Sequence, residues 1–179
     1  MNIKKISIVV SIITLSIVIG VTIFFVNGKI REKNADWYKC SKLVNASIPR
    51  DTKVLISSDS HGGLLGDGEY FVVFQFTGLQ YKEFLASLYQ NKTWTDLPLP
   101  KELEKIIFGE RKGTYSYEGH GKKKIPYLKR NGKYYFFDRF VKDNPQYKGT
   151  SILNRPSNNF IFGLLDNENR KLYIMKYDS

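Results

Sequence analysis

The stretch that decides the fold class covers residues 69–90 and reads EYFVVFQFTGLQYKEFLASLYQ. In its first part every second residue from Tyr70 to Phe76 is apolar and falls on one side of an extended chain, which predicts a β-strand. After Thr77 the apolar residues change to helical spacing, at Tyr81, Phe84, Leu85, Leu88 and Tyr89. This spacing predicts an amphipathic helix that ends near Asn91.

Further helices and strands are predicted before and after residues 69–90. A juxtamembrane helix within residues 29–48 and a short strand at 54–56 precede it, and a second short helix begins at Pro100 and ends at Gly109. Strands are then predicted at 133–141, 160–165 and 171–177. This order predicts an α+β domain, with an antiparallel sheet of about five strands and two or three helices on one face.

Composition excludes several classes of protein. The chain has 179 residues, of which 42% are hydrophobic and 25% charged, so a disordered or fibrous protein is excluded. A single cysteine excludes a disulfide framework and a zinc site built on two or four thiolates, and two histidines, His61 and His120, leave little room for a His-rich metal centre. We therefore expect one folded domain without a bound cofactor or metal and without a catalytic residue.

The N-terminal segment has the pattern of a membrane anchor. Residues 6–26 carry no charge and follow Lys4 and Lys5. As a helix this run would extend about 32 Å, close to the hydrocarbon thickness of a bilayer. A cleaved signal peptide is the alternative, but its apolar core is shorter and ends in small residues. The sequence predicts a single-pass transmembrane anchor over 1–28, the helix within 29–48 and an extracytoplasmic domain over 49–179, at the cell membrane.

A glycine-rich loop holds the most informative polar residues. A predicted strand leads into Asp59-Ser-His61-Gly62-Gly63, which resembles the first metal-binding motif of the calcineurin-like metallophosphoesterases. The other motifs of that family are missing, because no Asn-His pair exists and His120 is the only other imidazole. A metal-dependent hydrolase centred on Asp59, His61, Asp67 and Glu69 therefore stays only as an alternative.

Two other roles remain for the same loop. Its glycines suit a tight turn, and Asp67-Gly68 is a strong turn signal before the strand at Glu69. Glycines next to a histidine also suit close approach by a ligand or partner. The predicted ligand or partner loop comprises Asp59, His61, Gly62, Gly63, Asp67, Gly68 and Glu69.

Positive charge is concentrated farther along the chain. Residues 101–133 hold ten basic and four acidic residues, within a chain of net charge +11. The predicted basic patch comprises Lys122, Lys123, Lys124, Lys129 and Arg130. Such a patch favours an acidic protein partner or an anionic component of the envelope. A solvated surface loop is the alternative, and nucleic acid is not an expected partner of an extracytoplasmic domain.

Three blocks of residues give the chain a resemblance. They are Asp59-x-His61-Gly62-Gly63-x-x-Gly66-Asp67-Gly68, then Tyr134-Tyr-Phe-Phe-x-Arg139, then Leu153-Asn154-Arg155-x-Ser157-x-Asn159-Phe160. Together they resemble a set of small proteins from Gram-positive bacteria, many of which have an N-terminal membrane or export segment. The resemblance implies no activity. The sequence as a whole favours a non-enzymatic membrane-anchored protein with a binding, accessory or immunity-type role at the cell envelope.

Overall fold

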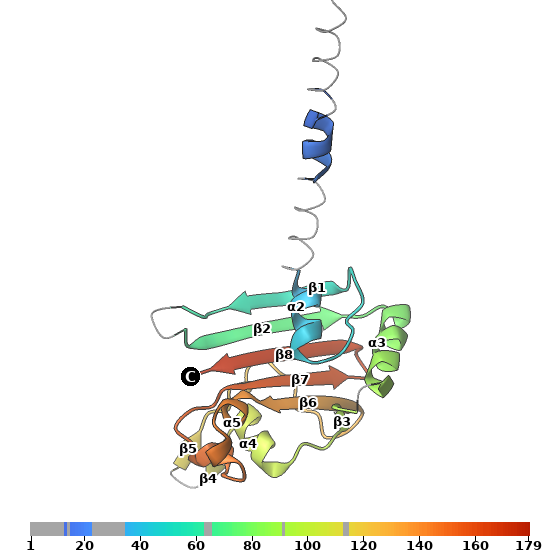
Figure 1. The fold of residues 1–179 in the computed structure, drawn as a ribbon. Helices are drawn as coiled ribbons and strands as arrows, with labels where there is room; N and C mark the ends of the chain where they lie inside the picture. The colour runs from blue at the N-terminus through green and yellow to red at the C-terminus, as the bar shows by residue number, and fades with distance from the viewer. Residues whose placement is uncertain (1–12, 14, 23–34, 63–65, 91, 113–114) are drawn as a thin grey trace, which may run out of the picture.

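A computed structural model describes residues 13, 15–22, 35–62, 66–90, 92–112 and 115–179. Its centre is a six-stranded antiparallel sheet in the order β1-β2-β8-β7-β6-β3, drawn in Figure 1. The strands are β1 (Lys53–Asp59), β2 (Gly68–Gln75), β3 (Thr95–Asp96), β6 (Gly132–Asp138), β7 (Phe160–Asp166) and β8 (Lys171–Asp178). A separate hairpin joins β4 (Glu110–Lys112) to β5 (Tyr115–Tyr117). The predicted α+β class with an antiparallel sheet is confirmed.

The helices are α2 (Asp36–Leu43), α3 (Gly78–Gln90), α4 (Lys101–Phe108) and α5 (Arg139–Asp143), with 3₁₀ turns η1 (Pro145–Tyr147) and η2 (Ile152–Asn154). The α4 boundaries match the prediction, since Pro100 and Gly109 are its caps. The predicted strand at 133–141 is too long. The Asp138 side chain accepts a hydrogen bond from the backbone N–H of Val141, which ends β6 and starts α5.

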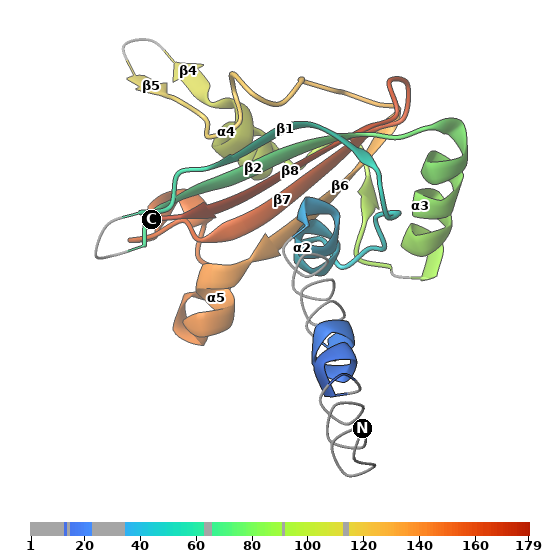
Figure 2. The same cartoon turned by 90° about the horizontal axis from the view of Figure 1, so that it is seen from above.

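The sheet is covered on both faces, so the expectation of helices on one face is wrong. One face, here called the α2 face, packs Val72 and Ile174 against residues of α2 and α3. The other, here called the α4 face, packs Phe71 and Met175 against Ile106 and Ile107 of α4 (Figure 2). Strands β2, β7 and β8 are apolar at most positions because both of their faces are buried.

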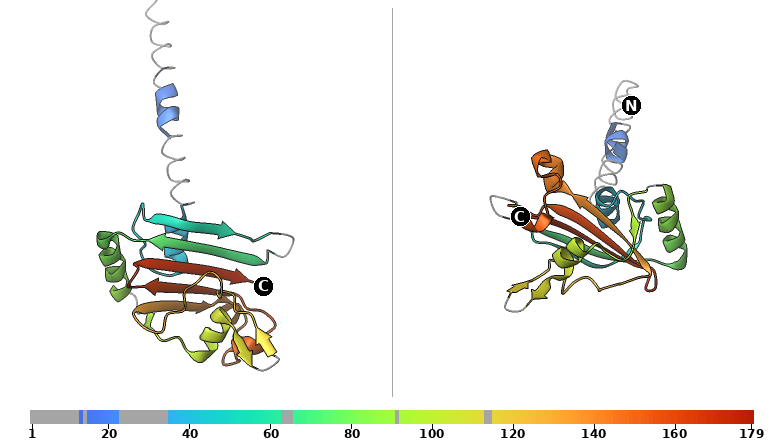
Figure 3. Two further views of the ribbon diagram at one scale, coloured as in Figure 1. Left: turned by 180° about the vertical axis from the view of Figure 1, so that it is seen from behind. Right: turned by 90° about the horizontal axis from the view of Figure 1, so that it is seen from below.

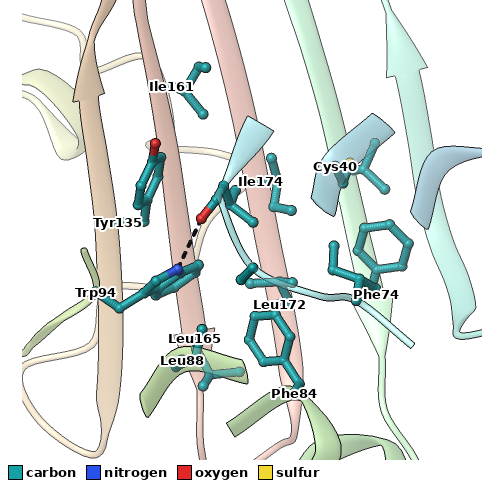
Figure 4. Close-up of a cluster of buried hydrophobic side chains, with 14 of the residues drawn as sticks. Cys40, Phe74, Phe84, Leu88, Trp94, Tyr135, Ile161, Leu165, Leu172 and Ile174 are labelled. Carbon is teal, nitrogen blue, oxygen red and sulfur yellow. Dashed lines mark hydrogen bonds between the residues drawn. The ribbon is translucent and has the colours of Figure 1, made fainter. Parts of the chain in front are cut away.

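Trp94 organises the core on the α2 face (Figure 4). Its indole Nε1–H donates to the backbone carbonyl of Val44, 3.1 Å away, and its ring meets Phe84 edge-on. A Cβ placed on Gly163 would lie 2.9 Å from the Trp94 ring, so glycine provides the space for the indole. This hydrogen bond joins the C-terminal end of α2 to the core that α2, α3 and the sheet form on this face.

The two edges of the sheet are β1 and β3, seen from behind in Figure 3. Strand β3 has two residues and pairs only with β6. Strand β1 has seven residues, all exposed, and pairs only with β2, with an irregularity between Val54 and Ile56. The predicted sheet of about five strands differs from the observed one by the short strand β3.

The predicted membrane anchor lies largely outside the described residues. Within the predicted 1–28 anchor, residues 13 and 15–22 are described, as helix with exposed side chains. This helix stands beyond the β1 edge of the sheet in Figure 1, and Figure 2 shows that it also projects away from the sheet on the α2 face. Among the described residues, no helix has both the length and the apolar character needed to cross a bilayer. Of the predicted helix within 29–48, the structure shows Asp36–Leu43.

Candidate functional site

His61 lies between two carboxylates that are far apart in the sequence. Its Nδ1 atom lies 2.6 Å from Oδ1 of Asp59, at the end of β1. Its Nε2 atom lies 3.0 Å from Oδ2 of Asp178, at the end of β8. The backbone N–H of His61 also donates to Asp59. One imidazole thus joins the ends of two strands that do not pair with each other.

Gly68 permits this link across the intervening strand β2. It pairs with Asp178 of β8, and the backbone of Ser60 and His61 passes directly over it. A Cβ on Gly68 would lie 2.6 Å from both the Cα and the N of His61. Its φ angle of 155° is also one that other residues rarely adopt. A glycine is therefore required at position 68 because the chain itself passes so close to it. This reason adds to the turn that the sequence predicts there.

Asp178 is the centre of a charged cluster. Its carboxylate pairs with Arg139 and with Lys176, whose Nζ atom lies 2.6 Å from Oδ2. Burial opposes ionisation of this carboxyl, but the hydrogen bond from Lys176 and the charges of Lys176 and Arg139 hold its pKa below the ordinary value. Hydrogen bonds from His61 likewise lower the pKa of Asp59. The cluster therefore keeps both carboxylates ionised at neutral pH.

A pocket of about 430 Å³ opens beside this cluster, between α2 and the sheet. It is lined by Tyr38, Lys39, Lys42 and Leu43 of α2 and by Asp59, His61, Tyr70 and Lys176. Among the ion pairs of the described residues, none involves Lys39 or Lys42. Within this part of the chain, the pocket therefore presents two ammonium groups without a carboxylate partner.

Buried contacts hold α2 against this pocket. The hydroxyl of Tyr70 donates to Oδ1 of Asp36 at 2.6 Å, which ties the first turn of α2 to β2. Cys40, one turn later, is fully buried, and burial raises the pKa of its thiol to about 12. The α2 wall of the pocket is thus fixed to the sheet. The cysteine has a packing role and no nucleophilic one.

The three sequence blocks that carry the resemblance meet at this end of the sheet. The first block supplies His61, and the second supplies Arg139, which pairs with Asp178. The third supplies Arg155, whose guanidinium pairs with Asp138 of the second block. Residues from distant parts of the chain therefore converge around the end of β8.

The four residues predicted as an alternative metal site do not converge. Asp59 and His61 lie on the α2 face, whereas Glu69 pairs in register with Tyr177 and binds Lys124 at 2.5 Å on the α4 face. Asp67 is exposed. The described part of the chain contains no group of three metal-binding side chains. In the predicted loop Gly62 is exposed, and Gly63 lies outside the described residues.

The predicted basic patch is divided between the two ends of the sheet. Lys122 and Lys123 are exposed, and Lys124 pairs with Glu69 near the start of β2. Lys129 and Arg130 come shortly before Gly132 of β6. The pairing of neighbouring strands aligns Gly132 across the sheet with Gln75, the last residue of β2. Glu69 and Gln75 are six residues apart on β2, which corresponds to about 20 Å along an extended strand. The five cations thus form two separate groups.

His120 has a structural environment on the α4 face. Its ring lies 4.0 Å from that of Tyr177, and its Nε2 atom is 3.1 Å from the Tyr117 hydroxyl. Burial lowers its pKa below the ordinary value. The two histidines therefore lie on opposite faces and cannot act on one ligand.

Sequence reasoning missed most residues of the pocket. Lys39 and Lys42 lie one turn apart in the predicted juxtamembrane helix, and Lys176 and Asp178 share a face of the last strand. These spacings are visible in the sequence. What it does not show is that β8 lies next to β2, which brings Asp178 within reach of His61, 117 residues away.

Comparisons of the chain with models of protein families, with curated proteins and with solved structures gave no significant match.

Proposed function

We propose that this protein is a membrane-tethered binding protein of the cell envelope, whose extracytoplasmic domain holds an anionic group in the pocket between α2 and the sheet. It acts on its ligand by binding alone. The observation that carries the proposal is the position of the two α2 lysines, which form no ion pair within the described residues, beside the charged cluster around His61 and Asp178.

The pocket suits an anion in both charge and size. Lys39, Lys42 and Lys176 line it together with one carboxylate, that of Asp59. Lysine presents a compact positive charge with three donors, which suits phosphate or carboxylate groups. A volume of about 430 Å³ lies within the range of small-molecule sites. The ligand class is therefore a small molecule, or an exposed side group of a larger one, that bears phosphate or carboxylate.

The membrane tether is supported by the N-terminal segment. Residues 6–26 are uncharged, and residues 15–22 are helical with exposed apolar side chains such as Leu15, Ile17 and Val18. Exposed apolar surface over such a length is costly in water but stable in lipid. Among the described elements, α2 is the next one along the chain after residues 15–22, and it forms one wall of the pocket.

Calorimetric titration of the full-length protein in mild detergent tests the binding. The probes are inorganic phosphate, glycerol phosphate and an acidic peptide. We expect at least one probe to bind saturably, and the double change Lys39→Gln with Lys42→Gln to weaken its Kd about tenfold, equivalent to about 1.4 kcal/mol. The matched control changes two exposed lysines near α3, Lys82→Gln with Lys92→Gln, and should bind as before.

Two results would contradict the proposal. One is the absence of saturable binding for all three probes. The other is equal weakening in the pocket variant and in the control variant, because it would mean that only the net charge of the protein matters.

A further inference from the structure

We propose that the ligand of this protein is an anionic glycan. Its charged group lies in the pocket between α2 and the sheet, here called the first pocket, and a neighbouring sugar lies in a second pocket on the other side of α2. This inference rests on the proposed function, because it assigns a ligand class to the same site.

The second pocket lies between α2, the segment that follows it and α3, on the α2 face of the sheet (Figure 2). Its volume of about 550 Å³ is within the range of small-molecule sites. The backbone N–H of Ser47 donates to the Ser87 hydroxyl of α3, 3.2 Å away, and joins two sides of the pocket. The lining residues are Trp37, Tyr38, Ser41, Lys42, Asn45, Ala46, Ser47, Ile48 and Ser87.

Helical spacing places the two pockets on either side of one ridge of α2. Lys39 lines only the first pocket, and Trp37 lines only the second. Tyr38 and Lys42, one turn apart, line both. The Lys42 ammonium lies over the Tyr38 ring, 5.7 Å from its centre. A helix with its side chains is about 10 Å across, so a single sugar does not reach both pockets, whereas a chain of sugars does.

The lining of the second pocket has the chemistry of a sugar site. Trp37 packs partly against the core and meets the Tyr38 ring edge-on, with 5.8 Å between the ring centres. Asn45 and Ser47 are exposed and add an amide and a hydroxyl. Lys42 is the only charged residue among the described residues that line the pocket. A sugar ring matches this lining, because its C–H faces pack against aromatic rings and its hydroxyls exchange hydrogen bonds with neutral polar groups.

An acidic peptide fits the two pockets less well. An extended peptide gains most of its affinity by pairing its backbone with a strand edge. The surface between these pockets is a helix, whose backbone groups bond within the helix itself. Ala46 and Ile48, the aliphatic residues of the second pocket, are only 8% and 2% exposed and offer little surface to an apolar side chain.

The test is calorimetric titration of the full-length protein in a detergent without a sugar headgroup, because such a headgroup would compete for the second pocket. The monosaccharide probes are galacturonate and glucose phosphate, and the matching trisaccharides are trigalacturonate and maltotriose phosphate. Triglutamate, with the same net charge as trigalacturonate, represents an acidic peptide. We expect at least one trisaccharide to bind about tenfold more tightly than its monosaccharide, because the second pocket adds contacts within one molecule.

Two variants locate the added contacts. Ser47→Trp fills the second pocket from an exposed position, and Trp37→Leu removes the aromatic face while keeping an apolar side chain against the core. Both should abolish the tenfold gain of the trisaccharide and leave monosaccharide binding unchanged, which also shows that the variants are folded. The matched control is Ser116→Trp, at an exposed position on β5, which should keep the gain.

Trisaccharides that bind no more tightly than their monosaccharides would overturn the glycan assignment and leave the anion pocket intact. A gain that persists in both Ser47→Trp and Trp37→Leu would overturn it as well. Triglutamate binding that is as tight as that of the better trisaccharide, and equally weakened by Ser47→Trp, would overturn it in favour of an acidic peptide. No saturable binding of any probe would contradict the proposed function, and this assignment with it.

Discussion

At the scale of single residues, Gly68 and His61 define the local structure of the site. His61 spans β2 to reach Asp178, and Gly68 lies directly beneath its backbone. For the glycine-rich loop the sequence left open a tight turn or close approach by a ligand or partner, and at Gly68 the group that approaches closely is the chain itself. The composition of the loop could not distinguish these cases, because both require a residue without a Cβ.

The change Gly68→Ala should destabilise the fold. The added Cβ would lie 2.6 Å from two backbone atoms of His61, which cannot move without breaking the link to Asp178. We expect a loss of roughly 2 kcal/mol in the free energy of unfolding, measured by urea denaturation. Gly62→Ala is the control, because a Cβ at that position would have nothing within 4 Å of it. Equal effects of the two changes would contradict the proposed role of Gly68.

At the scale of elements, the sequence pattern identifies strands and helices better than it identifies neighbours. The period-two pattern from Tyr70 to Phe76 and the helical stripe through Phe84 correspond to β2 and α3 in one core. Strand order is set by packing over long sequence distances, so the position of β8 between β2 and β7 could not be predicted.

The ion pairs of Asp178 join β8 to the loop after β1 and to α5, and should make stability pH-dependent. The folded-state pKa of Asp178 is lowered, so its contribution is present above the unfolded-state pKa of about 4 and is lost as pH falls through the lower folded-state value. Asp178→Asn should cost about 2 kcal/mol at neutral pH and much less in acid. Denaturation at several pH values checks this.

The control for that measurement is Asp96→Asn, at an exposed ion pair with Lys133 on the opposite edge of the sheet. Because exposed pairs contribute little, this change should leave stability nearly unaltered at every pH. A constant loss in Asp178→Asn from neutral to acidic pH would show that the carboxylate has only a packing role.

At the scale of the whole molecule, the proposed tether and the pocket are linked through helix α2. The helix of residues 15–22 projects on the α2 face of the sheet in Figure 2, α2 is the next described element along the chain, and α2 forms one wall of the pocket. The predicted basic patch, in contrast, is divided between two ends of the sheet. Local charge density in a sequence does not determine which cations share a surface, since that depends on the course of the chain.

The most direct test of the account is the location of the protein in intact cells. Membrane fractions should contain the full-length chain, released by detergent but not by high salt. External protease should digest the domain in intact cells and leave the N-terminal segment in the membrane. A mature chain that is freely soluble and begins after residue 28, or a domain that external protease cannot reach until the cells are lysed, would contradict the account.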